Sequence, residues 1–147
     1  MDNKKFTLIE IIIATAVIGI LATLASLGVN GAQKKTRDNR RIEDMNIIRS
    51  AMKIIYNQTG SYNGQTCQEG ALVADCRGEE VVKLINNISQ LKDPASKGLS
   101  CVQTFGKDCD YAFSVLNDES FSVLFYLEKG TQGLDKGQHI LTEKGFQ

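Results

Sequence analysis

Apolar residues fill the chain almost without interruption from Phe6 to Val29, and Glu10 is the one charged residue in this run. As a helix, the nineteen residues Ile11–Val29 rise about 29 Å, close to the thickness of a bilayer's hydrocarbon core. Residues 6–29 are therefore predicted to form a helix that lies in a membrane or in a bundle of similar helices.

The pattern becomes amphipathic after Gln33, where apolar residues recur at the spacing of one helix face. That face comprises Ile42, Met45, Ile48, Ala51, Met52, Ile55 and Tyr56. Basic residues are expected to supply much of its solvated polar cover: Arg37, Arg40, Arg41, Arg49 and Lys53. Because Gly60 can close a helix C-terminus, one helix of about 50 residues, roughly 75 Å long, is predicted.

Alternation of apolar and polar residues predicts antiparallel strands in the C-terminal part of the chain. Tyr111–Leu116 and Phe121–Leu127 form the clearest hairpin, joined by the polar turn Asn117–Ser120. A third strand is expected at Gln138–Thr142, after a glycine-rich loop over Gly130–Gly137.

A short helix is predicted over Glu79–Leu91, since two glutamates favour its N-terminus and Asp93-Pro94 ends it. Its apolar stripe is Val82, Ile85, Ile88 and Leu91. Ser61–Gly78 is loop-like, and Cys101–Asp110 is expected to be a loop or a strand edge. The predicted fold class is α+β, with a long N-terminal helix packed on a small antiparallel β-sheet.

Four cysteines lie in the polar part of the chain, at Cys67, Cys76, Cys101 and Cys109. An even number in a small domain behind a membrane-targeting segment is typical of two disulfides formed in an oxidising compartment. The spacings differ from the close pairs of zinc sites. Three pairings are possible, and the two local ones, 67–76 and 101–109, are favoured because each clips a loop.

The zero net charge of the chain conceals an uneven distribution. Residues 33–56 carry seven basic and three acidic side chains, whereas residues 57–147 carry eight basic and twelve acidic ones. A basic segment beside an acidic domain favours head-to-tail packing of copies, or contact with anionic lipid headgroups, over specific nucleic-acid binding.

Glu10 is the most informative single residue, because a carboxylate in an apolar segment costs a few kcal/mol unless a cation or donor satisfies it. The one evident partner in the sequence is an amine at the N-terminus. Two plainer interpretations of the segment are a cleaved secretory signal and a single-span anchor. Glu10 interrupts the apolar core that a signal peptide needs, and the helical pattern continues beyond Val29.

The apolar helix is preceded by the motif Lys4-Lys5-Phe6-Thr7-Leu8-Ile9-Glu10. This motif resembles the N-terminus of type IV pilins and type II secretion pseudopilins. The exit of the helix, Tyr56–Tyr62, and the C-terminal hairpin with Tyr126-Leu127-Glu128 are also similar to these proteins. The resemblance implies a pilin-like fold with a leader at 1–5, a transmembrane or filament-core helix at 6–29, and a helix half with a globular domain at 30–147.

The resemblance also implies roles for individual residues. A prepilin peptidase cuts between Lys5 and Phe6 and methylates the new Phe6 amine. In the filament, Glu10 neutralises the Phe6 amine of a neighbouring copy. The sequence departs from the family at Lys5, because the residue before the cut is normally Gly and sometimes Ala or Ser.

The expected function is a structural subunit of a type IV pilus-like filament, with a type II secretion pseudopilin as the alternative. A monomeric membrane-anchored extracytoplasmic binding domain is the alternative from another class. The expected partners are further copies of the chain, the peptidase, an inner-membrane assembly platform and an ATPase motor. The expected location is the inner membrane, with a cytoplasmic N-terminus, and then a surface filament or the periplasm.

Enzymatic activity is not expected. His139 is the only histidine and lacks the Ser or Cys constellation of a nucleophilic site, and no glycine-rich phosphate loop is present. No cofactor or metal is expected, although Ca²⁺ in the 130–137 loop is conceivable through Asp135, Glu128 and Thr131. Asn57-Gln58-Thr59 and Asn87-Ile88-Ser89 match glycosylation acceptors, a pattern common by chance.

Overall fold

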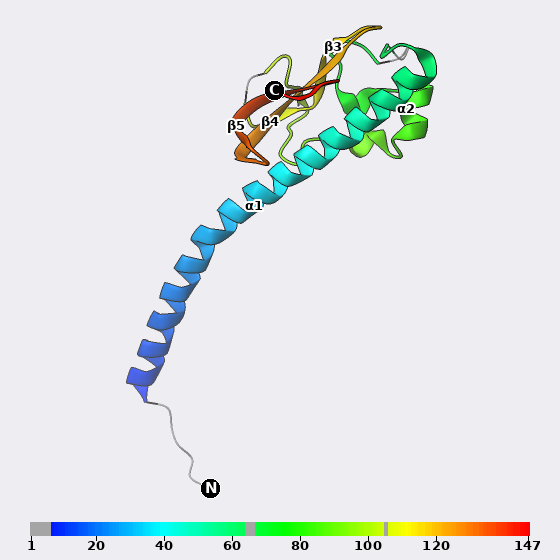
Figure 1. Ribbon diagram of the computed structural model, residues 1–147. Coiled ribbons are helices and arrows are strands. Elements are labelled where there is room, and N and C mark those ends of the chain that lie inside the picture. The colour runs from blue at the N-terminus through cyan, green and yellow to red at the C-terminus, as the bar shows by residue number, and fades with distance from the viewer. Residues whose placement is uncertain (1–6, 64–66, 105) are drawn as a thin grey trace. The chain divides into compact units, whose positions relative to one another are not determined.

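The computed structural model describes residues 7–63, 67–104 and 106–147. The chain divides into two compact units, residues 1–34 and 35–147, and the helix α1 (Leu8–Thr59) contributes to both. The predicted processing site, Lys5 and Phe6, lies outside the described residues. The fold class is α+β, one long N-terminal helix with a small antiparallel sheet, as the sequence predicts (Figure 1).

The first unit contains the apolar part of α1, which by length and composition is suited to crossing a membrane. Its large apolar side chains are exposed, from Leu8 at 78% to Val17 at 50%. Its described residues from Thr7 to Leu24 are all exposed, and a helix that is apolar on all sides requires lipid or other protein chains around it.

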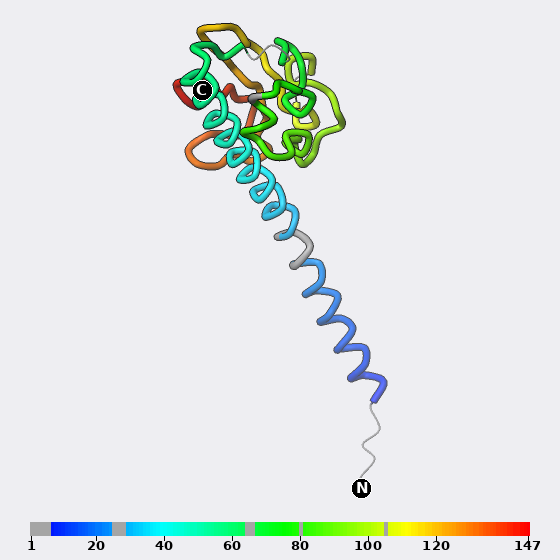
Figure 2. The backbone as a smooth tube through the Cα atoms, turned by 90° about the vertical axis from the view of Figure 1, so that its right-hand side faces the viewer, coloured from blue at the N-terminus to red at the C-terminus, as the bar shows by residue number. Residues whose placement is uncertain are grey.

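The second unit is a four-stranded antiparallel sheet combined with the C-terminal half of α1, as Figures 1 and 2 show. The strand order is β3-β4-β5-β6. The strands are β3 (Ala112–Leu116), β4 (Phe121–Thr131), β5 (Leu134–Thr142) and β6 (Gly145–Phe146). A separate parallel pair joins β1 (Leu99–Ser100) to β2 (Cys109–Asp110).

One hydrophobic core fills the second unit. The face of α1 predicted from the helical spacing is buried, with Ile42, Met45, Ile48, Met52 and Ile55 at most 2% exposed. They share a cluster with the alternate residues of β4, which are Phe121, Val123, Phe125 and Leu127. Tyr56, which was assigned to the same face, is 39% exposed and stacks on Tyr62 instead.

The glycine-rich loop predicted over Gly130–Gly137 is wrong. β4 and β5 extend through most of it and meet at a two-residue turn, Gln132-Gly133, in which both φ angles are positive. This is the tight hairpin geometry that asparagine, aspartate and glycine favour, and a glutamine at the first position hides it from the sequence. Gly130 is required here, because a Cβ atom would lie 2.5 Å from the carbonyl oxygen of Leu134.

The single helix predicted over Glu79–Leu91 is also wrong, because it is two short elements. α2 (Glu79–Leu84) and the 3-10 turn η2 (Ile88–Gln90) are separated by Asn87, which has a left-handed backbone with φ 62°. Consecutive asparagines hold a helix weakly, and asparagine tolerates the left-handed region. A further 3-10 turn, η1 (Val73–Asp75), precedes α2.

The four cysteines form the two local disulfides that the sequence favours, Cys67–Cys76 and Cys101–Cys109. All four are at most 6% exposed. The first disulfide closes the segment that follows α1, and the second joins the ends of the β1–β2 connection.

Candidate functional site

Glu10 has a partner inside its own helix. The backbone N–H and the hydroxyl of Thr7 both donate to Oε2 of Glu10, at 2.8 and 2.9 Å, and the Glu10 N–H donates to the Thr7 hydroxyl at 3.3 Å. This is a capping box, in which the residue before the helix and the residue three positions later satisfy each other. The sequence carries the signal of this motif, Thr-x-x-Glu before an apolar run, which identifies Thr7 as a partner in addition to the predicted terminal amine.

The capping box uses one carboxylate oxygen of Glu10. Both bonds from Thr7 end on Oε2, and no described residue donates to Oε1. The side chain is exposed on the isolated chain. The site therefore holds an oriented carboxylate at the start of an apolar helix, with one oxygen that no residue in the described part of the chain binds.

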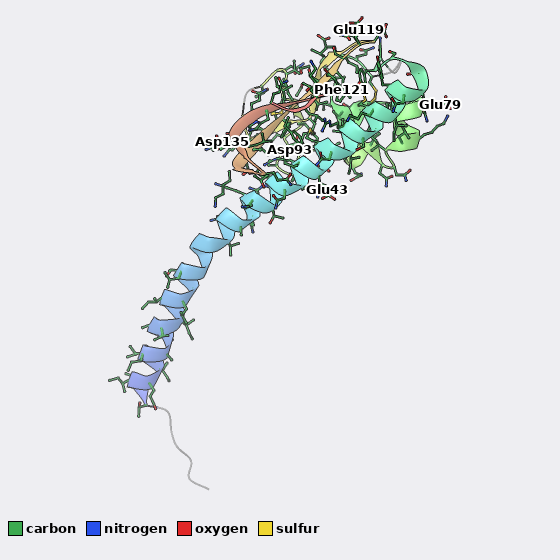
Figure 3. All side chains as sticks on the ribbon, viewed as in Figure 1. Glu43, Glu79, Asp93, Glu119, Phe121 and Asp135 are labelled. Carbon is green, nitrogen blue, oxygen red and sulfur yellow. A yellow bond between two sulfur atoms is a disulfide. The ribbon has the colours of Figure 1, made fainter. Side chains whose placement is uncertain are left out.

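A second charged site lies in the unit formed by residues 35–147, centred on the fully buried Arg41. Its Nε and Nη2 donate to the two carboxylate oxygens of Asp93 at 2.6 and 2.7 Å. Its Nη1 donates to Asp38 at 2.7 Å and to Glu128 at 3.0 Å. The labelled position of Asp93 in Figure 3 shows this carboxylate beside the C-terminal half of α1.

Arg37 and Asp38 complete the attachment of α1 to β4. Arg37 donates twice to Glu128, at 2.6 and 2.7 Å. Asp38 accepts the backbone N–H groups of Glu128, Lys129 and Gly130 at 2.9, 2.8 and 3.0 Å. Because the β4–β5 register shifts between Leu127 and Gly130, the carboxylate satisfies donors at an irregular point of the strand.

The prediction that Arg41 belongs to the solvated polar cover is wrong, since its side chain has no exposed area. Three carboxylates match the planar guanidinium, a tertiary arrangement that helical periodicity does not reveal. Burial alone lowers the pKa of Arg41, but its hydrogen bonds and attraction to Asp93, Asp38 and Glu128 outweigh burial and raise it. Arg41 therefore stays charged and joins three segments of the unit.

The pKa values of the carboxylates in this region shift in different directions. Hydrogen bonds from Arg37 lower the pKa of Glu128 to about 2, with Arg41 adding to the effect against the opposing influence of burial. For Asp93, burial raises the pKa despite the hydrogen bonds from Arg41. Burial also raises the pKa of Asp44, which accepts a hydrogen bond from the Tyr111 hydroxyl at 3.0 Å.

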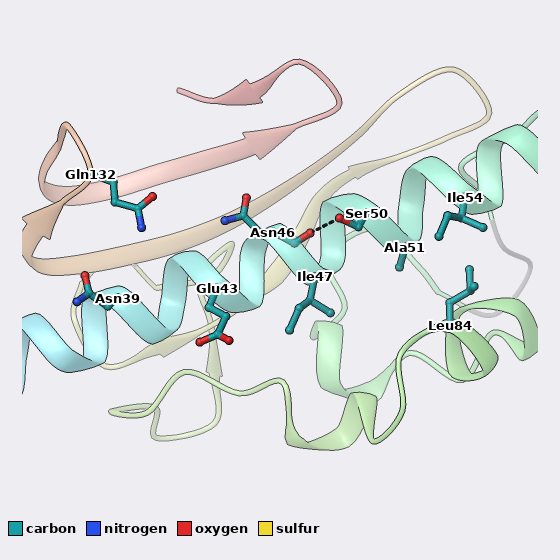
Figure 4. Close-up of a pocket in the computed structure, with 9 residues that line it drawn as sticks. All are labelled: Asn39, Glu43, Asn46, Ile47, Ser50, Ala51, Ile54, Leu84 and Gln132. Carbon is teal, nitrogen blue, oxygen red and sulfur yellow. Dashed lines mark hydrogen bonds between the residues drawn. The ribbon is translucent and has the colours of Figure 1, made fainter.

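A groove of about 700 Å³ runs along α1 in the second unit (Figure 4). Its lining residues are Asn39, Glu43, Asn46, Ile47, Ser50, Ala51, Ile54, Leu84 and Gln132. Ile47 and Ile54 are 41% and 40% exposed, and Ile54 faces Leu84 across the groove. This part of α1 therefore has partly exposed apolar side chains in addition to its buried face.

The remaining sequence candidates lie in ordinary structural positions. His139 is in β5, where its ring is 5.7 Å from that of Phe125 and its Nε2 contacts the Asp135 carbonyl oxygen at 2.8 Å. Asn57 lies within α1, and Asn87 lies in the exposed turn after α2. Within the described residues no group of three or more His, Cys, Asp or Glu side chains could hold a metal ion.

Compared with family models, curated proteins and solved structures, the chain matches none of them. Support for a function therefore comes from the geometry of the two units and from the residues that carry the resemblance.

Proposed function

We propose that the chain is a structural subunit of a type IV pilus-like filament and that copies assemble through the N-terminal half of α1. The observation that carries this proposal is Glu10, an oriented carboxylate with one oxygen that no described residue binds, on an apolar helix whose described side chains are exposed. In a monomeric anchor this carboxylate serves only to cap the helix, whereas in a filament its second oxygen also binds a cation.

A filament supplies cover for the apolar side chains of the helix and a cation for Glu10. Lipid surrounds the apolar side chains before assembly, and the helices of other copies surround them afterwards. The Phe6 amine of a neighbouring copy supplies the cation for Glu10. Such a pair adds little stability over an apolar contact, but a buried unpaired charge is heavily penalised, so the pair selects one axial offset between copies.

We base the proposals for processing, location and assembly machinery on the resemblance to pilins and pseudopilins. A prepilin peptidase cuts between Lys5 and Phe6 and methylates the Phe6 amine. The chain resides in the inner membrane with a cytoplasmic N-terminus, and an assembly platform with an ATPase motor moves it into the filament. The two disulfides agree with a domain that folds in an oxidising compartment.

Replacing Glu10 by alanine tests the function directly. Glu10→Ala should abolish or greatly reduce the filaments sheared from cells, because no carboxylate is left to select the register. The full-length protein should remain in the membrane with both disulfides formed. The control is Glu119→Ala, which removes an exposed acid from the β3–β4 turn (Figure 3) and should leave filament yield unchanged. Normal filaments from Glu10→Ala would refute the proposal.

A further inference from the structure

Three exposed lysines gather around one end of the second unit: Lys35, Lys129 and Lys136. Lys35 lies one helical turn before Asp38, and Asp38 binds the backbone N–H of Lys129 at 2.8 Å. Lys136 is on β5 between the register pairs Leu127–Gly137 and Gly130–Asp135, and so lies opposite the irregular part of β4. We call these three residues the lysine end.

The lysine end is not neutralised within the second unit. None of its three ammonium groups forms an ion pair with another described residue. The neighbouring carboxylates of Asp38 and Glu128 are already bound to Arg41 and Arg37. Asp135, which Figure 3 labels at the hairpin end of the sheet, is the one exposed acid beside the lysines on β4 and β5.

We propose that the lysine end binds the headgroups of anionic phospholipids while α1 is in the membrane, before the chain enters a filament. Lys35 follows the last residue of the uncharged run, Val29, by six positions, which is about 9 Å of helix. The headgroup layer on each side of a bilayer is roughly 5–8 Å thick. A lysine at this distance reaches the phosphates, and its charge is complementary to them.

Lipid is a better occupant than a second copy of the chain for one reason. Each copy meets headgroups at this depth while it is in the membrane, before any other copy packs against it. Lys129 and Lys136 lie on β4 and β5, so the proposed contact includes residues beyond α1. Each lysine near an anionic surface strengthens association up to roughly fivefold, and salt screens the effect.

The test uses the full-length chain in nanodiscs made of phosphatidylcholine alone or of phosphatidylcholine mixed with phosphatidylglycerol. Hydrogen–deuterium exchange of the amides in residues 128–137 is measured by mass spectrometry. Exchange should be roughly fivefold slower or more in the anionic nanodiscs. This difference should disappear at about 1 M salt, where the Debye length is about 3 Å.

The variant K35Q/K129Q/K136Q should lose the lipid-dependent protection. The matched control K53Q/K83Q/K144Q removes three exposed lysines elsewhere in the second unit and should keep it. Equal exchange in the two lipids, or equal loss in both triple variants, would overturn the proposal. Protection that appears only when copies polymerise, and in both lipids alike, would assign the surface to a second copy instead. The measurement is made on unassembled chains, so its failure leaves the proposed filament function unaffected.

Discussion

Arg41 and Glu10 are charged residues on one helix that are satisfied in opposite ways. Arg41 is buried and its donors meet Asp93, Asp38 and Glu128 within the same unit. Glu10 is exposed, and Thr7 satisfies one of its carboxylate oxygens. A buried ion pair is costly to break because the partners cannot return to water, whereas an exposed one can be exchanged. Arg41 is therefore suited to holding the fold, and Glu10 to forming a contact with another molecule.

Arg41→Met should destabilise the second unit strongly. The substitution leaves the carboxylates of Asp93 and Asp38 buried without their cation, and breaking a buried pair in this way costs about 3–5 kcal/mol. Denaturant titration of the detergent-solubilised chain, followed by near-UV circular dichroism, measures the loss. Arg40→Met removes an exposed cation from the adjacent position and should change the free energy of unfolding by about 0.5 kcal/mol or less. Equal effects of the two substitutions would contradict the structural role of Arg41.

Glu128 should make stability fall in acid. Its pKa is about 2 in the folded chain, below the ordinary value of 4.5, so the unfolded chain binds the extra proton first as the pH falls. The stabilisation is complete above pH 4.5 and is lost as the pH approaches 2. The raised pKa values of Asp93 and Asp44 act in the opposite direction, since protonation favours their folded forms.

Glu128→Gln separates these opposing contributions. The variant should be less stable than the parent at pH 6, and the difference should shrink steadily as the pH is lowered toward about 2, because the neutral parent side chain then resembles glutamine. The measurement is the free energy of unfolding at a series of pH values. A difference that stays constant with pH would show that Glu128 does not titrate in this way.

The elements of the fold differ in how far local sequence determines them. α1 and the β3–β4 hairpin could be predicted because apolar periodicity over many residues reports the buried face directly. The break between α2 and η2 could not, since Asn87 in a left-handed conformation leaves the spacing of Ile85 and Ile88 unchanged. The full length of the β4–β5 pairing could not be predicted either, because a run with several glycines favours a loop.

The two candidate sites also differ in how far the local sequence reveals them. Glu10 is evident from the sequence because a single charge in an apolar run is conspicuous, and its cap at Thr7 follows from a short local motif. Arg41 could not be placed, since it is one of six basic residues on the part of α1 in the second unit and only contacts with Asp93 and Glu128, 52 and 87 positions away, distinguish it. Long-range pairing of charges leaves no local pattern.

The two units differ in how their apolar side chains are covered. The apolar half of α1 exposes its side chains in every direction, and the second unit carries a complete core of its own. The proposed filament would therefore cover the apolar half of α1 without unfolding the second unit. The groove beside Ile47 and Ile54 is the part of the second unit where α1 still presents apolar side chains outward, so we expect it to face other copies in the filament.

Ile47→Glu and Ile54→Glu should each reduce filament yield substantially while leaving the chain folded. Both side chains are about 40% exposed in the isolated chain, so the charge remains hydrated until another copy packs against the groove. Burying an unpaired carboxylate at that contact then costs several kcal/mol, which assembly must overcome at every copy. The sheared-filament yield is measured beside Lys53→Glu, a charge change on the same helix outside the groove lining. Undiminished filaments from both isoleucine variants would show that the groove faces solvent in the assembled state.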